Sequence, residues 1–149
     1  MATLAENKKA HFDYEFLDQY EGGLELFGHE VKSVKAKRAD LSGAHVVVRG
    51  GEVFLVNANI PEYQANNIPD NYKSDRTRKV LVTKKEIEKL AEKESKKGLT
   101  LVPISLYNKG PIIKLSFAVA KGKKKYDKRQ SIKKRESDIE IERTLKNQR

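Results

Sequence analysis

The cations between residues 121 and 135 are the residues whose types point most directly to chemistry. This segment holds nine Lys and Arg residues, one acid and one aromatic ring, that of Tyr126. Each cation placed on a phosphate releases a condensed counterion, so the segment favours a polyanionic partner. An aromatic ring among cations can stack on an unpaired base while the cations hold the phosphates. The segment therefore predicts RNA binding, and the alternative interpretation is a solubilising or non-specific tail.

A second group of cations stands where a predicted strand begins. Arg76, Arg78 and Lys79 precede the apolar residues 80–82. These side chains could point at one phosphate track of a nucleic acid, or they could keep an edge strand soluble. The sequence alone favours neither interpretation over the other.

No catalytic machinery is visible in the sequence. His11, His29 and His45 lack the spacing of a metal or protease motif, and neither a P-loop nor a Gly-x-Ser-x-Gly or Gly-x-Gly-x-x-Gly motif occurs. A carboxylate such as Glu30 could do acid–base work, but with 16 acids in residues 1–120 a solvated or capping role is favoured. We expect no enzyme activity, no bound metal and no cofactor.

The positive charge is concentrated near the C-terminal end of the chain. The 149 residues carry a net charge of +10, and residues 121–149 hold 12 Lys and Arg against five Asp and Glu. A basic chain favours nucleic acid or an acidic membrane surface as its partner. Because the tail lacks the Trp, Phe and Leu face that an interfacial helix buries, we favour nucleic acid and expect no membrane partner.

No segment has the composition of a targeting or membrane-spanning sequence. Residues 1–10 lack the apolar run of a signal peptide, and no stretch approaches the ~18–20 apolar residues of a membrane span. The absence of cysteine excludes disulfides and thiolate zinc sites and makes the chain indifferent to redox conditions. We therefore expect a cytoplasmic protein.

The elements that must position these residues can be predicted from apolar periodicity and turn residues. Residues 12–27 alternate around Gly22 and Gly23, which predicts two short strands joined at a sharp bend. Apolar residues at helical spacing over residues 31–41, with lysines on the other faces, predict a short basic helix.

A hairpin and a loop follow in the middle of the chain. Residues 46–48 and 53–56 flank Gly50 and Gly51, and glycine reaches the positive φ of a two-residue turn without steric cost. Residues 64–78 show no period and many turn formers, which predicts a long exposed loop.

Another helix and another hairpin complete the predicted core. Thr83 and Glu86 form a capping box for a helix whose apolar face carries Ile87, Leu90 and Ala91 and which Gly98 closes. Residues 99–107 and 112–120 then predict a hairpin across residues 108–111. Within its first strand, Pro103 indicates a bulge or an unpaired edge position.

Six or seven short strands with two helices between them fit a closed antiparallel barrel better than βαβ units. We expect a mainly β protein: a barrel of about six strands with two or three short helices over residues 1–120, and a basic tail over residues 121–149. The tail has too few apolar residues to offset the entropy of ordering, so it should be disordered when free. Ser137 with Glu140, and Ile141 with Leu145, predict a latent helix over about residues 131–146.

Several stretches of the chain, taken together, resemble one protein family over nearly the full length. These are Asn-Lys-Lys-Ala at 7–10, Gly-His-Glu-Val-Lys-Ser-Val at 28–34, Arg-Thr-Arg-Lys-Val-Leu-Val at 76–82, Ser-Leu-Tyr at 105–107 and Ala-Lys-Gly-Lys-Lys-Lys-Tyr-Asp-Lys-Arg at 120–129. The chain resembles the SmpB family, the SsrA-binding proteins of bacterial trans-translation.

The resemblance implies an oligonucleotide-binding-like barrel that binds the tRNA-like domain of transfer-messenger RNA and delivers it to the vacant A site of a stalled ribosome. It also implies a tail that becomes helical in the empty messenger channel of the small subunit and reaches the decoding centre. The barrel residues expected at transfer-messenger RNA are Asn7, Lys8, Lys9, Glu30, Lys32, Ser33, Arg76, Arg78, Lys79, Lys121, Lys123 and Lys124. The tail residues expected at the ribosome are Tyr126, Asp127, Lys128, Arg129, Lys133, Lys134, Arg135 and Leu145.

Two positions depart from the family pattern. Some members have histidine where this chain has Tyr126, so stacking on a base is preserved but an imidazolium charge is not. Many members have an aromatic residue, often tryptophan, in place of His29.

The sequence thus favours a noncatalytic, monomeric RNA-binding adaptor. The alternative from another class is a ribosome-associated assembly or structural protein whose tail neutralises ribosomal RNA. A nuclease that uses Glu30 with His29 is a distant third.

Overall fold

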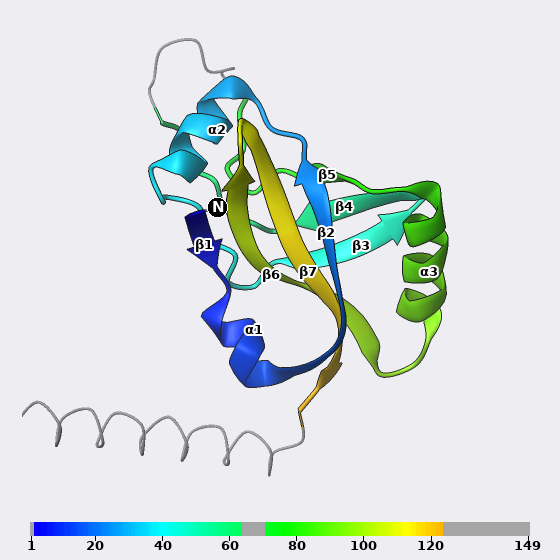
Figure 1. Ribbon diagram of the computed structural model, residues 1–149. Helices are drawn as coiled ribbons and strands as arrows, with labels where there is room; N and C mark the ends of the chain where they lie inside the picture. Colours follow the sequence, from blue (N-terminus) through cyan, green and yellow to red (C-terminus); the bar gives the residue numbers. More distant parts are fainter. Residues whose placement is uncertain (1, 64–70, 124–149) are drawn as a thin grey trace, which may run out of the picture.

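The computed structural model describes residues 2–63 and 71–123, which contain seven strands and three helices (Figure 1). In chain order the elements are β1 (Ala2–Glu6), α1 (Lys8–Asp13), β2 (Tyr14–Leu24), α2 (Gly28–Lys35), β3 (His45–Arg49), β4 (Glu52–Val56), β5 (Arg78–Leu81), α3 (Lys84–Ser95), β6 (Leu99–Lys109) and β7 (Ile112–Gly122). No helix of this part of the chain is long and apolar enough to cross a membrane.

Six of the strands close into a ring. The hydrogen-bonded order is β6-β3-β4-β5-β2-β7, and β7 pairs back onto β6, while β1 adds to the side of β6. Every pairing is antiparallel. This confirms the predicted closed antiparallel barrel of about six strands.

Alternating side chains of the strands fill the inside of the ring. Along β7, Ile113, Leu115, Phe117 and Val119 are all buried, as the two-residue period of a strand requires. Buried leucines from β4, β6 and α3 pack against them in one core cluster. A smaller cluster of Ala10, Val102 and Ala120 lies under α1.

Helix α3 lies across the end of β3. Its capping box of Thr83 and Glu86 forms as predicted, and Gly98 follows the helix with φ +85°. Leu90 is completely buried, and Glu94 accepts a hydrogen bond of 2.9 Å from the Val48 amide of β3. The predicted apolar face was wrong at Ala91, which is exposed, because only the side of the helix that carries Leu90 and Glu94 reaches the barrel.

Both predicted hairpins are present. Gly50 and Gly51 form the turn between β3 and β4 with φ of 59° and 73°, and the flanking pair is Arg49 with Glu52. The β6–β7 hairpin is longer than predicted, because Lys109 still pairs with Ile112 and leaves a two-residue turn.

The bulge predicted at Pro103 is also present. The register of β6 against β7 shifts between Pro103 and Ser105. An extra residue on one strand breaks the ladder locally, which accommodates a residue that has no amide hydrogen to donate.

The prediction of two strands bent at Gly22 and Gly23 was wrong. β2 runs through both glycines without a break. A Cβ atom on Gly22 would lie 2.7 Å from Val80 Cγ1 and 2.9 Å from the Leu81 carbonyl oxygen of β5. Gly22 is therefore explained by the close approach of β5, and not by a bend.

Two elements at the N-terminal end were not predicted, and a third ends early. Asn7 caps α1 by accepting from the Ala10 amide, which places Phe12 in a helix instead of a strand. β1 pairs with β6. The basic helix stops at Lys35, before Leu41, because Lys37 has a φ of 61° that a helix cannot continue through.

The last strand extends past the expected end of the barrel. β7 continues to Gly122, which pairs with Tyr14, and the Lys123 amide donates to the Asp13 carbonyl oxygen at 2.9 Å. The first residues of the expected tail are thus part of the barrel. The predicted disorder and latent helix of the tail concern residues 124–149, which lie outside the described residues.

We predict that the two adjacent glycines of β2 respond differently to alanine. Gly22→Ala should lower the free energy of unfolding by roughly 1–3 kcal/mol, because the new methyl group meets backbone and packed side chains. Gly23→Ala is the matched control, since its Cβ would lie 3.7 Å from the nearest atom, an ordinary contact. It should be neutral or slightly stabilising. Urea unfolding of both variants checks this, and equal effects would contradict the close-approach explanation.

Candidate nucleic-acid interface

A buried carboxylate lies at the start of α2. Glu30 is the third residue of the helix and its side chain is completely buried. Its Oε1 accepts a hydrogen bond of 2.8 Å from the Phe27 amide, which the helix itself leaves without a partner. A buried carboxylate is tolerated only when it is paired and hydrogen-bonded, so its surroundings must supply cations.

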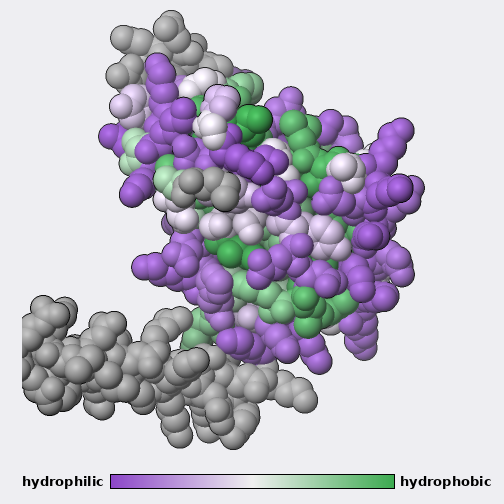
Figure 2. All heavy atoms as spheres, in the orientation of Figure 1, coloured by the Kyte–Doolittle hydropathy of each residue, from purple (hydrophilic) through white to green (hydrophobic). Residues whose placement is uncertain are grey.

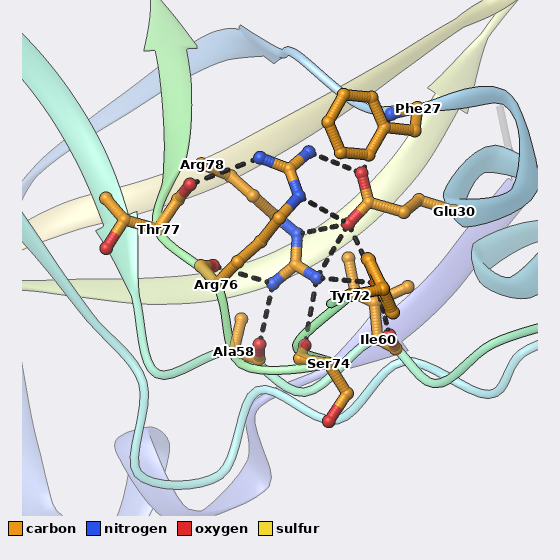
Figure 3. A network of polar contacts seen from close by, with 9 residues as sticks. All are labelled: Phe27, Glu30, Ala58, Ile60, Tyr72, Ser74, Arg76, Thr77 and Arg78. Atoms are coloured by element: carbon orange, nitrogen blue, oxygen red, sulfur yellow. Dashed lines mark hydrogen bonds and ion pairs between the residues drawn. The ribbon is translucent and has the colours of Figure 1, made fainter. Parts of the chain in front are cut away.

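Two arginines supply them: Arg76, just before β5, and Arg78, the first residue of β5 (Figure 3). Arg76 donates from Nε to Glu30 Oε2 at 3.0 Å and also from Nη2 to Oε1. Arg78 donates from Nε to Oε2 at 2.9 Å. Because both guanidinium groups are planar forks, they fix the position and the orientation of the carboxylate.

Arg78 is completely buried, and its remaining donors are used by the loops around it. Nη1 donates to the carbonyl oxygens of Ala58 at 2.8 Å and Arg76 at 3.0 Å. Nη2 donates to the Ser74 carbonyl oxygen at 2.9 Å. These carbonyl groups belong to the long connection between β4 and β5, outside the strands of the ring. Arg78 therefore satisfies carbonyl groups of that connection, just as Glu30 satisfies an amide group at the start of α2.

Tyr72 joins the same network. Its hydroxyl group lies 2.9 Å from Glu30 Oε2 and 2.7 Å from the Ile60 carbonyl oxygen, and it accepts from Arg78 Nη2 at 3.1 Å. The His29 ring packs edge-on against the Tyr72 ring at 4.6 Å. His29 therefore makes a ring contact in this cluster, at the position where many family members have an aromatic residue.

The charges of the network determine how Glu30 titrates. Burial by itself would raise the pKa of Glu30, because a low dielectric disfavours the charged form. Hydrogen bonds from Arg76, the Phe27 amide and Arg78 outweigh burial and lower the pKa from 4.5 to about 2. Burial and the bond to Glu30 raise the pKa of Tyr72, so its hydroxyl group remains protonated and can donate.

Helix α2 presents cations to solvent on the side away from this network. Lys32 and Lys35 are exposed, and Lys37 and Arg38 are exposed in the turn that follows. The Arg38 guanidinium lies 5.3 Å from the centre of the Tyr63 ring, and Tyr63 lines an open groove with Lys32, Lys35 and Ala36. On the face shown in Figure 2, hydrophilic residues cover most of the surface. Cations beside an aromatic ring suit RNA, whose phosphates and bases they can contact together.

The structure brings only some of the predicted site residues together. Lys32 and Ser33 follow Glu30 on α2. Arg76 and Arg78 form ion pairs with Glu30. Of these five, Glu30, Ser33 and Arg78 are completely buried, so any contribution to RNA binding would have to be indirect. A direct contact with RNA remains a prediction for Lys32 and for the partly exposed Arg76.

The two interpretations of the cations at β5 were both wrong in part. Arg78 and Lys79 are neighbours in a strand and point to opposite faces, so they cannot line one phosphate track. Lys79 pairs with Glu52 at 2.9 Å instead. Nor is β5 an edge strand, because it pairs with both β4 and β2.

The remaining barrel residues of the prediction gather at the other end of the molecule. Figure 1 shows α1 and α2 near opposite ends of the long strands β2, β6 and β7. At the α1 end Asn7 is buried, whereas Lys8, Lys9 and Lys121 are exposed. Lys123 donates from Nζ to the His11 carbonyl oxygen at 3.0 Å.

One predicted barrel residue, Lys124, lies outside the described residues. So do all the predicted tail residues: Tyr126, Asp127, Lys128, Arg129, Lys133, Lys134, Arg135 and Leu145. Their contacts with RNA or the ribosome remain predictions.

Sequence reasoning missed three aromatic residues of this region. Tyr72 and Tyr63 lie in or next to a stretch without apolar period, and Phe27 precedes the helix as its N-cap. An aromatic side chain in an otherwise polar loop was the signal that could have marked Tyr72. Among the described residues, no group of three or more His, Cys, Asp or Glu side chains could hold a metal ion.

Comparison with known proteins gives full-length matches. A family model described as SmpB protein matches residues 4–147. The SsrA-binding protein of Thermosipho africanus (strain TCF52B) is 45% identical over 150 residues, all of both chains. That of Streptococcus mutans serotype c (strain ATCC 700610 / UA159) is 48% identical over 144 residues, 97% of this chain and 92% of the relative.

A solved chain has a similar fold. It is described as "tmRNA-SmpB: a journey to the center of the bacterial ribosome" and is 36% identical. The match has a TM-score of 0.69 and covers 88% of this chain and 95% of the solved one.

We predict that the stability difference between the wild type and Glu30→Gln depends on pH. Because folding lowers the pKa of Glu30 from 4.5 to about 2, its contribution is complete above pH 4.5 and is lost as the pH falls towards 2. Glu30→Gln should be destabilised at neutral pH, and the difference should narrow by about 3 kcal/mol on acidification.

Denaturant unfolding across this pH range measures the difference. The control is Glu52→Gln, which removes an exposed carboxylate paired with Lys79 and should change stability by less than about 1 kcal/mol throughout. A wild-type advantage over Glu30→Gln that stays constant with pH would show that the ionised carboxylate is not what stabilises this region.

Proposed function

The chain belongs to the SmpB protein family, and from that premise we propose that it is an RNA-binding adaptor that binds transfer-messenger RNA in ribosome rescue. The observation that carries this proposal is the match to SsrA-binding proteins over the full length of the chain. The similar solved chain, described together with tmRNA and the bacterial ribosome, supports the same partners.

The proposed contact surface on the barrel is the α2 end. Lys32, Lys35 and Arg38 are exposed there beside Tyr63 and could take phosphates and a base edge or ring. Glu30 and Arg78 hold the helix from inside. The tRNA-like domain of transfer-messenger RNA is the part we expect to meet this surface.

The proposed second function lies in the tail. Residues 124–149 follow a barrel whose last described contact is made by Lys123. We expect them to enter the vacant A site, with Tyr126 and Asp127 to Arg129 at the decoding centre and the later cations in the empty messenger channel. Their cations suit ribosomal RNA.

The proposed role requires positioning and no bond-breaking chemistry, so the protein would not be an enzyme. Its site of action would be the cytoplasm, where ribosomes translate. A single copy would carry both surfaces and would act as a monomer.

Recovery of the protein from cells with sequencing of its bound RNA tests the proposal. An adaptor should enrich one transfer-messenger RNA far above the ribosomal RNA background. An assembly or structural protein would instead return ribosomal RNA in proportion to its abundance, and that result would overturn the adaptor role. Labelled RNA incubated with the protein and a divalent cation should remain intact, whereas cleavage would support a nuclease.

We predict that a chain ending at Lys123 folds and binds transfer-messenger RNA but fails to support tagging of stalled peptides. All strands of the ring end by Gly122, so the truncation removes no described pairing. Thermal unfolding, RNA binding and a peptide-tagging assay give the three readouts, with the full chain as control. Loss of RNA binding at an unchanged melting temperature would show that the tail also holds the transfer-messenger RNA. Normal tagging would show that the tail is dispensable.

A further inference from the structure

An aromatic ring is exposed at the N-terminal end of α2. Four large apolar side chains of the described residues are about half exposed: Leu17, Phe27, Leu81 and Ile112. Scattered aliphatic residues of this kind are normal on a protein surface and need no explanation. Phe27 differs from the other three because it is aromatic and because its surroundings hold it in place.

One face of the Phe27 ring is covered by an arginine. The Arg76 Cζ atom lies 4.1 Å from the ring centre, within cation–π distance. Figure 3 shows the ring next to the Arg76 guanidinium and the Glu30 carboxylate. The guanidinium cannot swing away easily, because two of its nitrogens donate to Glu30.

The backbone beneath the ring is fixed by the same carboxylate. The Phe27 amide donates to Glu30 Oε1 at 2.8 Å, and the His29 ring lies 5.9 Å from the Phe27 ring at a tilt. An aromatic side chain has only two rotatable angles, so little more is needed to set its orientation. The Phe27 ring is therefore a preorganised surface that is 49% exposed.

The charge around the ring indicates what it would meet. Arg76 lies behind it, and the exposed Lys32 and Lys35 follow along α2. One exposed ring, at the start of a helix that carries exposed lysines, is too small for an apolar protein interface, which needs many contacting residues. It matches the arrangement in which cations hold phosphates and an aromatic face takes one base.

We propose that Phe27 is a stacking site for one unpaired base of the bound RNA, with Arg76 on the opposite face of the ring. The inference rests on the proposed binding of transfer-messenger RNA and adds a base contact to it. The order of the stack is base, Phe27 ring and Arg76 guanidinium, with Glu30 holding the last of these. Phosphate contacts carry no sequence information directly, so this ring would give the surface a preference for RNA with a base free at that point.

Binding of transfer-messenger RNA to full-length variants at several salt concentrations tests the proposal. Phe27→Ala and Phe27→Leu should each weaken binding roughly 5- to 150-fold, the range for loss of one base stack. Phe27→Tyr should bind like the wild type. The slope of log affinity against log salt should not change in any variant, because no charge is lost. Ile112→Ala, at an equally exposed position of β7, is the matched control and should bind normally.

A spectroscopic variant reports stacking directly. The chain contains no tryptophan, so Phe27→Trp introduces a single indole fluorophore at the site. Stacking on a base should quench its emission when transfer-messenger RNA is added. A variant with tryptophan in place of Leu17, exposed on β2, is the control and should keep its emission.

The outcomes separate the two proposals. A wild-type chain that binds transfer-messenger RNA no better than unrelated RNA would overturn the proposed function. A wild type that binds selectively while Phe27→Ala binds equally well would overturn the stacking site and leave the function intact. Normal binding by Phe27→Leu would also overturn stacking, since an apolar contact alone would then be sufficient. Unquenched emission from Phe27→Trp with RNA bound would overturn it as well, because the ring would then not lie against a base. Normal RNA binding by Phe27→Ala with reduced peptide tagging would place the ring against a different partner and overturn the proposal.

Discussion

The buried pair of Glu30 and Arg78 is the interaction on which the functional end of this barrel depends. Each partner is completely inaccessible to solvent, so each requires the charge of the other. Glu30 also accepts from the start of α2, and Arg78 donates to carbonyl oxygens of the long connection before β5. One ion pair thus supplies hydrogen-bond partners to backbone groups of both segments. Removing Glu30 would leave the buried Arg78 without a counter-charge, which is among the most destabilising changes in proteins, whereas Glu30 without Arg78 would still pair with Arg76.

This arrangement explains how a short helix can be both polar and well positioned. Helix α2 has eight residues and buries only Glu30, Ser33 and Val34, so neither its length nor its apolar face would hold it alone. The network anchors its first turn and leaves its lysines to solvent. A surface that binds a flexible polyanion gains affinity when its own groups are already ordered, because less entropy is lost on binding.

The sequence predicted the parts of the fold that local chemistry decides. The Gly50–Gly51 turn and the Thr83 cap depend on neighbours within a few residues, and both were found as expected. The role of Gly22 was predicted wrongly, because the glycine is required by contact with β5, a strand almost sixty residues later in the chain. Glu30, Arg76 and Arg78 were recognised as important, but their mutual pairing joins two polar stretches and leaves no periodic signal. The burial of Glu30 and Arg78, and hence their role in holding α2 in place, could be recognised only from the three-dimensional structure.

The pairing of β2 with β7 also determines when the fold can form. Tyr14 pairs with Gly122, so the ring joins the two ends of the described chain. Synthesis begins at the N-terminus, and β2 must wait for its partner while the rest of the barrel is made. Such non-local pairing is typical of domains that fold slowly for their size. A chain that ends before β7 would therefore not form a smaller barrel. It would form an open sheet, and the unpaired edges of β2 and β6 would favour aggregation.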